Sequence, residues 1–245
     1  MSGAMYYMDF DEIKVTYIIV GKLVNQTPLS IGSGRGAFGA VDNPIVRLNN
    51  IPYIPGSSLK GVLRSEAERY VKTLSPSEFV CDIFNPTDEN KGELALKDKQ
   101  KENYNPCIIC RIFGGPTIAS HLRVRNAMAL SPYRTEMRTS VSINRITGGQ
   151  YPGRLYDIEY VVPLTKFDFL MEVENIDLLG KSKEAEVANY LIAFLMSGNA
   201  WLGGRKSIGM GNVKLTEVRV RKIGLKRDKF VEEDVSEEFL KEVIK

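Results

Sequence analysis

The sequence predicts an α+β fold of modified ferredoxin-like arrangement, in which two β-α-β units contribute strands to one sheet. Four segments rich in β-branched and aromatic residues are typical of buried strands, at 14–24, 122–130, 165–173 and 212–220. Two other segments repeat apolar residues at helical spacing, at 57–74 and 184–196. The composition, with 43% hydrophobic and 26% charged residues, is that of a globular protein, and we expect one domain over residues 1–245.

Three stretches interrupt this pattern and predict additions to the domain. Residues 75–120 begin polar and acidic and contain all three cysteines, which indicates an inserted lid or zinc-binding subdomain. Residues 134–160 have little apolar periodicity and carry Gly148-Gly149 at their middle, which predicts a projecting hairpin. Residues 230–245 are strongly charged, and we expect them to form a helical tail.

The charges are segregated along the chain, although the net charge is only +3. Seven arginines and one acid lie within residues 111–154, and nine basic residues and two acids lie within 205–229. Phosphate binding depends on clustered lysines and arginines rather than on net charge, so this pattern favours a polyanion as partner. Solvated faces whose charges alternate by element are the other explanation.

A glycine-rich loop at 202–211 has part of the spacing of a nucleotide-binding P-loop. The residues after Gly203 are Gly204 and Arg205, however, where a Lys-Ser/Thr pair is needed to hold phosphate and magnesium. A nucleotide hydrolase is therefore excluded. Backbone N–H groups at Gly203 and Gly204, with the cations Arg205 and Lys206, could still hold an anionic backbone, or the loop is only a tight turn before a strand.

The three cysteines have the spacing of a structural zinc site. Cys107 and Cys110 form a C-x-x-C pair, and Cys81 lies upstream of them. A tetrahedral site needs a fourth ligand, for which His121 is the first candidate and Asp82 the second. The alternative is three reduced, partly buried thiols.

The sequence shows no segment expected to enter or cross a membrane. No apolar run approaches the roughly 20 residues of a transmembrane helix, and the first residues lack the apolar core of a signal peptide. The odd number of cysteines favours a reducing compartment over a disulfide framework. We expect a cytoplasmic protein.

The single histidine, His121, limits the chemistry that could act on a polyanion such as RNA. One histidine cannot serve as both acid and base, so metal-independent cleavage by two histidines is excluded. A carboxylate working with a divalent ion such as Mg²⁺ is favoured instead. Asp42 is the candidate, because it is an isolated acid in a basic, glycine-rich stretch; alternatively, it caps the turn into Asn43.

Six motifs in order along residues 14–220 resemble the RAMP superfamily of CRISPR-associated proteins, and within it the repeated backbone subunit of type III effector complexes. The most specific match is IPGSSLKG at 54–61. The others are PLSIGS at 28–33, GAVDNPI at 39–45, CRIFG at 110–114, NRIT at 144–147, and LGG at 202–204 with GMG at 209–211.

The resemblance implies a modified RNA-recognition fold, several copies of which line up along a guide CRISPR RNA with other type III subunits. The hairpin at 134–160 would be a thumb that splays the duplex of guide and target RNA, with Met137 as a wedge. Asp42 would then cut the target RNA at regular intervals with Mg²⁺ or a similar ion. The implied RNA contacts are Lys60, Arg64, Arg138, Arg145, Gly203, Gly204, Arg205 and Lys206.

Two alternatives remain within the same superfamily. The chain could be a catalytically inactive RNA-binding scaffold, in which Asp42 only shapes a loop. It could also be a guide-processing ribonuclease that works without metal, but the single histidine and the 39–45 motif count against this. Some relatives carry a histidine where this chain has Ser30, so any assistance from that histidine is absent here.

Overall fold

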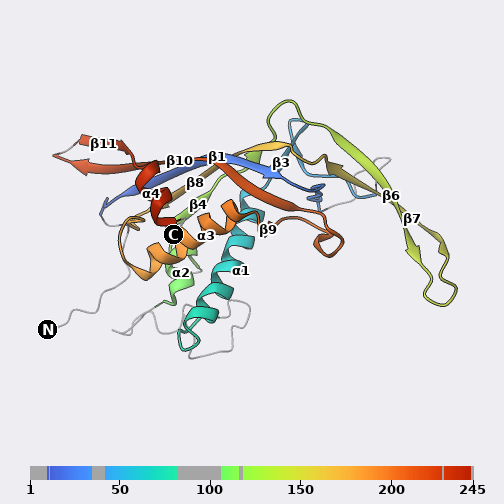
Figure 1. Ribbon diagram of the computed structural model, residues 1–245, viewed down its shortest axis with the longest axis horizontal. Helices are drawn as coiled ribbons and strands as arrows, with labels where there is room; N and C mark the ends of the chain where they lie inside the picture. The colour runs from blue at the N-terminus through green and yellow to red at the C-terminus, as the bar shows by residue number, and fades with distance from the viewer. Residues whose placement is uncertain are drawn as a thin grey trace.

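One antiparallel sheet forms the centre of the protein (Figure 1). The computed structural model describes residues 10, 12–34, 42–81, 106–115, 118–227 and 229–243. The strand order is β11-β10-β1-β8-β4, and β9 pairs with β10 off this path. The strands are β1 (Thr16–Asn25), β4 (Leu122–Val124), β8 (Lys166–Glu174), β9 (Ala200–Trp201), β10 (Asn212–Lys226) and β11 (Lys229–Asp234).

One face of the sheet is buried because its strands alternate apolar and exposed positions. In β1, Tyr17, Ile19 and Leu23 are fully buried, whereas Ile18, Val20 and Lys22 are half-buried. In β8, Phe167 and Phe169 continue the same buried surface. A strand turns successive side chains to opposite faces, so this alternation leaves the second face of the sheet open.

Helices cover the buried face of the sheet, as Figure 1 shows. They are α1 (Gly56–Leu74), α2 (Ile108–Phe113), α3 (Lys183–Ser197) and α4 (Ser236–Val243). The apolar stripe of α1 is fully or nearly fully buried at Leu59, Leu63 and Ala67, which are four residues apart. Helix α3 begins at the cap residue Ser182, whose Oγ accepts a hydrogen bond from the Ala185 N–H at 3.1 Å.

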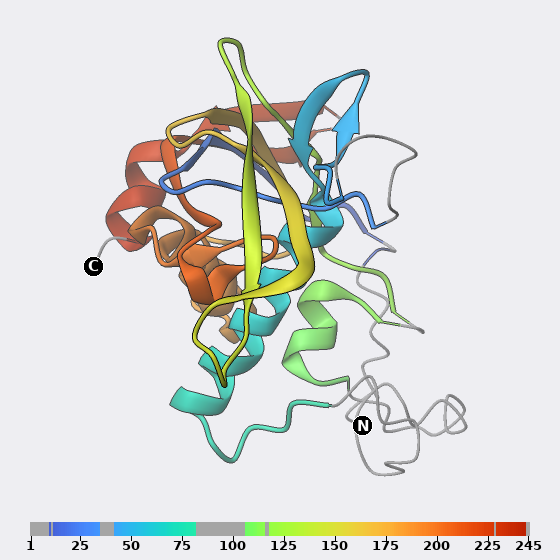
Figure 2. The ribbon, with the colours of Figure 1, turned by 90° about the vertical axis from the view of Figure 1, so that its right-hand side faces the viewer.

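A long hairpin leaves the body of the protein at the end opposite β11 (Figures 1 and 2). It consists of β6 (Thr135–Ile143) and β7 (Gln150–Val161), which pair antiparallel. A small sheet lies near its base and contains β2 (Arg47–Leu48), β3 (Ile51–Ile54) and β5 (Ala127–Met128). Among the described residues, no helix combines the length and the apolar character needed to cross a membrane.

The α+β class with an antiparallel sheet is confirmed, but two predicted segments differ. The segment 122–130 is not one strand, because it divides into β4 and β5, which belong to different sheets. The prediction of a helical tail over 230–245 is wrong for its first part, where β11 pairs with β10 and only α4 is helical. The charged side chains there are exposed, so the sequence carries no apolar alternation that would reveal the strand.

The range 75–120, predicted as an insertion, contains part of the core. Five of the six residues of α2 are buried, and Ile109 and Ile112 are completely so. Asp82, the second candidate for the fourth zinc ligand, lies outside the described residues.

Candidate active site and nucleic-acid interface

Asp42 lies at the base of the β6–β7 hairpin, and its side chain is exposed. The backbone N–H of Asp157 in β7 donates a hydrogen bond to Asp42 Oδ2 at 3.0 Å. The next residue, Asn43, pairs with β7 in parallel: its N–H donates to the Asp157 carbonyl at 3.2 Å, and its carbonyl accepts from the Glu159 N–H at 3.1 Å. The segment that carries Asp42 is thus attached to the free edge of β7.

A partly buried ion pair between Arg47 and Glu159 holds the same segment a few residues further along the chain. The Glu159 carboxylate accepts hydrogen bonds from the Ile45 N–H at 3.1 Å and from Arg47 Nη1 at 2.8 Å. Its other oxygen accepts from Arg47 Nη2, which also donates to Thr135 Oγ1 at 3.1 Å. The hydrogen bonds from Arg47 hold the pKa of Glu159 below its usual value, against the effect of burial, and the Ile45 N–H adds to this lowering.

The lowered pKa of Glu159 predicts a pH-dependent contribution to stability. A carboxylate with a depressed folded-state pKa stabilises the fold above its unfolded pKa of about 4.3, and this stabilisation disappears as pH falls through the folded-state pKa. We expect Glu159→Gln to lower the free energy of unfolding by about 1–3 kcal/mol at pH 7, and the difference to shrink below about pH 4. Urea unfolding of wild type and Glu159→Gln at pH 7 and at pH 3 measures this difference in the free energy of unfolding.

The matched control is Glu217→Gln, which removes an exposed partner of Lys166. That variant should leave the unfolding midpoint nearly unchanged at pH 7. A difference between Glu159→Gln and wild type that is equally large at pH 7 and pH 3 would contradict the assignment to the ionised pair.

The hairpin has an exposed surface, from its base to its tip, that mixes apolar and basic side chains. Met137 faces Glu159 directly across the two strands, and 63% of its surface is exposed. Arg138 and Arg145, both predicted RNA contacts, are exposed as well. Ile146 in the terminal turn is 95% exposed. Such a surface can contact a phosphate backbone and unstacked bases.

The glycine-rich loop at 202–211 also reaches the hairpin. The Arg205 guanidinium lies over the ring of Tyr156 in β7, 5.8 Å from its centroid. Gly204 donates its N–H to the Ser30 carbonyl at 3.0 Å, and a Cβ on Gly203 would lie 2.4 Å from the same oxygen. The structure therefore uses Gly203 for close packing against the loop at 28–33, and the exposed Lys206 extends from the same turn.

The two glycines are expected to respond differently to substitution. Gly203 has a φ of +75°, so Gly203→Ala combines a strained backbone with a clash against Ser30 and should cost about 1–3 kcal/mol. Gly204→Ala is the control, because the nearest neighbour of its added Cβ, the Ser30 carbonyl oxygen, would be 4.0 Å away. Thermal unfolding compares the two, and equal midpoints would contradict the packing role of Gly203.

Within the described part of the chain, Lys60 and Arg64 on α1 share no contact partner with Asp42, Arg47 or Glu159 and contact a different part of the protein. Lys60 Nζ donates to Ser120 Oγ at 2.7 Å, and burial, followed by the nearby charge of Arg64, lowers the pKa of Lys60. Arg64 donates to the Gly114 carbonyl at 3.0 Å and approaches the sulfur of Cys110 at 3.5 Å. These two cations are held mainly by groups of the protein near the cysteine cluster.

Cys81, Cys107 and Cys110 form a buried cluster. The sulfur of Cys81 is 3.3 Å from that of Cys110 and 3.4 Å from that of Cys107, and all three lie within 4.8 Å of one another. The contacts of Cys107, first with Cys110 and then with Cys81, lower the pKa of its thiol. Three converging cysteine sulfurs suit zinc or another soft metal ion, so the cluster can hold a metal.

The structure does not bring His121 into this cluster, contrary to the prediction. Its Nδ1 is 2.8 Å from the Glu174 carbonyl, and its ring stacks on Phe10 with centroids 4.5 Å apart. The only group of potential metal ligands found in the described part of the chain consists of the three cysteines. The backbone of His121 stays beside α2, where its N–H donates to the Ile112 carbonyl at 3.1 Å, but its ring points to Glu174 at the end of β8.

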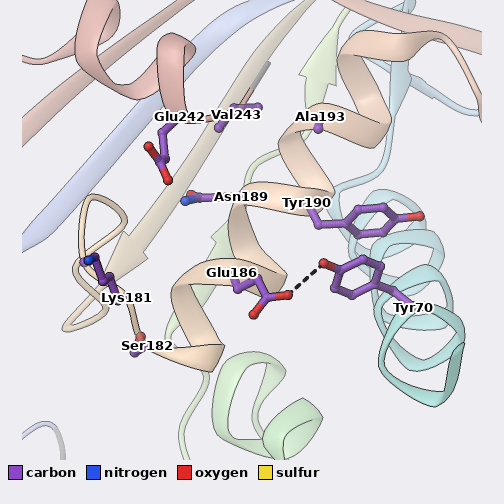
Figure 3. A pocket seen from close by; sticks show the side chains of 10 residues that line it. Tyr70, Lys181, Ser182, Glu186, Asn189, Tyr190, Ala193, Glu242 and Val243 are labelled. Carbon is purple, nitrogen blue, oxygen red and sulfur yellow. Dashed lines mark hydrogen bonds between the residues drawn. The ribbon is translucent and has the colours of Figure 1, made fainter. Parts of the chain in front are cut away.

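A surface pocket between α1, α3 and α4 contains none of the predicted site residues (Figure 3). Tyr70 and Tyr190 stack there with ring centroids 3.8 Å apart, and the Tyr70 hydroxyl donates to Glu186 at 3.0 Å. These contacts fasten α1 to α3.

Sequence reasoning missed Arg47, Tyr156 and Glu159. The signal that could have found them is local: Arg47 is a lone cation among the apolar residues at 45–48, and Glu159 is an acid within the apolar end of β7. A charged residue in such a setting usually has a buried partner.

Residues 22–214 match the sequence model of the RAMP superfamily, and the chain belongs to this superfamily. A protein of Mycobacterium tuberculosis named "CRISPR system Cms endoribonuclease Csm3" is 29% identical over 229 residues, which cover 83% of this chain and 87% of that protein. Proteins of the same name from Methanothermobacter thermautotrophicus and Enterococcus italicus are 27% and 28% identical. These alignments cover 84% and 80% of this chain, and 85% and 87% of the two relatives.

Proposed function

We propose that this chain is a guide-RNA-binding backbone subunit of a type III CRISPR effector complex and cuts complementary target RNA at regular intervals. The observation that carries the proposal is the attachment of Asp42 to the root of an exposed, partly apolar and basic hairpin. The Csm3 relatives, which are named endoribonucleases, support the same activity.

The proposed reaction is attack by a target 2′-hydroxyl on its neighbouring phosphate, leaving a cyclic phosphate and a 5′-hydroxyl. A regular A-form duplex does not allow the in-line geometry, so Met137 displaces a nucleotide and thereby supplies it. The Asp157 N–H orients the Asp42 carboxylate beside the distorted backbone. An exposed carboxylate suits Mg²⁺ or a similar ion, which would stabilise the charge that develops on the phosphate.

Arg138, Arg145, Arg205 and Lys206 would position RNA by contacts to its phosphates. Gly203 and Gly204 would shape the loop that presents the last two. Lys60 and Arg64 would contribute to guide binding from α1, where Lys60 is only half-buried. The partners are the guide CRISPR RNA, the target RNA, further copies of this chain and other type III subunits in the cytoplasm.

The finer description of the fold is also part of the proposal. We assign the chain to one ferredoxin-like domain related to RNA-recognition modules, with a thumb at 134–160. The support is the order β1, α1, β4, β8, α3, β10 along the chain, with the four strands adjacent as β10-β1-β8-β4. Within the inserted subdomain at 75–120, Cys81, Cys107 and Cys110 would hold a structural Zn²⁺ with a fourth ligand outside the cluster.

The test is to assemble the complex with a guide and end-labelled complementary RNA, with magnesium or with EDTA. We expect evenly spaced cuts that require the metal. Tight target binding without cuts would identify the inactive scaffold instead. Metal-independent cutting of the guide precursor would identify a processing ribonuclease.

A further inference from the structure

We propose that Glu159, through its ion pair with Arg47, is a positioning residue that holds Asp42 at a fixed position relative to Met137, the wedge of the hairpin. This inference rests on the proposed function. In this role, Glu159 sets the distance between the displaced nucleotide and the phosphate that is cut. It acts through the segment 42–47 and does not touch RNA.

Strand register places the wedge and the ion pair at one point of the hairpin. Met137 and Glu159 are direct cross-strand partners, as are Thr139 and Asp157 next to them. Directly opposed residues point to the same face with Cβ atoms roughly 5 Å apart. Thr139 Oγ1 donates to the Asp157 carboxylate at 2.6 Å, which ties the two strands together beside Asp42.

Glu159 connects this point to the catalytic segment through its side chain. One carboxylate accepts from the Ile45 N–H and from both terminal nitrogens of Arg47, and Arg47 also reaches Thr135 in the opposite strand. Two parallel hydrogen bonds between a guanidinium and a carboxylate restrict orientation as well as distance. The pair therefore joins β6, β7 and the segment 42–47.

The segment has a second support that does not involve Glu159. Val46 donates its N–H to the Ile31 carbonyl at 2.8 Å, and Ser33 donates to the Pro44 carbonyl at 3.2 Å. Removal of the Glu159 charge should therefore leave the segment folded against the loop at 28–33 and attached to β7 only by the hydrogen bonds at Asp42 and Asn43, so that its part from Ile45 to Arg47 can shift relative to β7. Such a shift changes the position of Asp42 without removing it.

The burial of Glu159 separates positioning from direct catalysis. Only 9% of the residue is exposed, and both carboxylate oxygens are occupied by protein donors. A misplacement of about 1 Å at a reacting group can reduce a rate about 100-fold, so loosening this pair is sufficient to slow cutting.

The experiment uses the assembled complex and compares wild type with Glu159→Gln, Arg47→Lys and the double variant. We expect Glu159→Gln to slow single-turnover cutting about 10–100-fold at saturating target. Guide and target affinity should stay within about twofold, because no RNA contact is removed. The cut should also spread to neighbouring phosphates, and the double variant should be no slower than the slower single variant.

Glu172→Gln is the matched control, because it breaks the ion pair between Glu172 on β8 of the main sheet and Arg125, and it should cut as wild type does. Unchanged rates and cut positions in both single variants would overturn the inference. Equal losses of assembly, affinity and rate would also overturn it, because they indicate a merely structural role. If wild type itself makes no cuts, the proposed function fails first, which distinguishes the two failures.

Discussion

Asp42→Ala should bind guide and target RNA and assemble normally, yet lose at least about 99% of the metal-dependent cutting rate. The carboxylate is exposed at the root of the hairpin, and its described partner is a backbone N–H. Its removal therefore takes away charge and a potential metal ligand without breaking the core. The measurement is single-turnover cleavage of end-labelled target in the assembled complex.

Two companion variants make this result specific. Asp42→Asn keeps an oxygen that can accept from the Asp157 N–H but loses the charge, and it should be as inactive as Asp42→Ala. Asp168→Ala removes another exposed aspartate, the partner of Lys22 on the open face of the sheet, and should cut normally. If Asp42→Ala cuts as fast as wild type, Asp42 only shapes the loop and the chain is a scaffold.

Cys107→Ser should remove a bound metal ion and destabilise the protein by at least about 3 kcal/mol. The three sulfurs converge in a buried site that joins α2 to the chain at Cys81. Loss of one sulfur leaves two, which cannot hold zinc tightly at neutral pH. Metal content by mass spectrometry and urea unfolding with and without a chelator measure the two effects.

Ala67→Ser is the control for this second result, because it places a hydroxyl in the fully buried stripe of α1 and leaves the sulfurs intact. It should lose stability but retain the metal. Wild-type protein that contains no metal and unfolds identically with a chelator would show that the cluster is three reduced thiols.

The sequence predicted those features whose signal is local. The stripe of α1 repeats every three or four residues, and the C-x-x-C pair brings two sulfurs together within one helical turn, so neither requires knowledge of distant contacts. Asp42 stood out by its isolation among glycines and cations. Helices α1 and α3, four strands of the sheet and the candidate catalytic residue could therefore be predicted, whereas α2 and β11 could not.

The contacts that hold the Asp42 segment could not be predicted from the sequence, because its partners come from far along the chain. Arg47 and Glu159 are 112 residues apart, and Asp42 and Asp157 are 115 residues apart. These residues come together only because the segment 42–47 packs against β7. The prediction of His121 as a zinc ligand was wrong for a related reason. Nearness in sequence to the cysteines did not determine where its ring points, and the ring lies beside Glu174, 53 residues further along the chain.

The position of the single tryptophan gives the chain an intrinsic optical reporter. Trp201 in β9 pairs with Asn212, is 37% exposed and immediately precedes Leu202 and the glycine-rich loop. With no second tryptophan, the tryptophan fluorescence of this chain, excited selectively at the red edge of the absorption band, comes from one known place. Its wavelength and quenching will follow changes in the solvation of that loop without any attached dye.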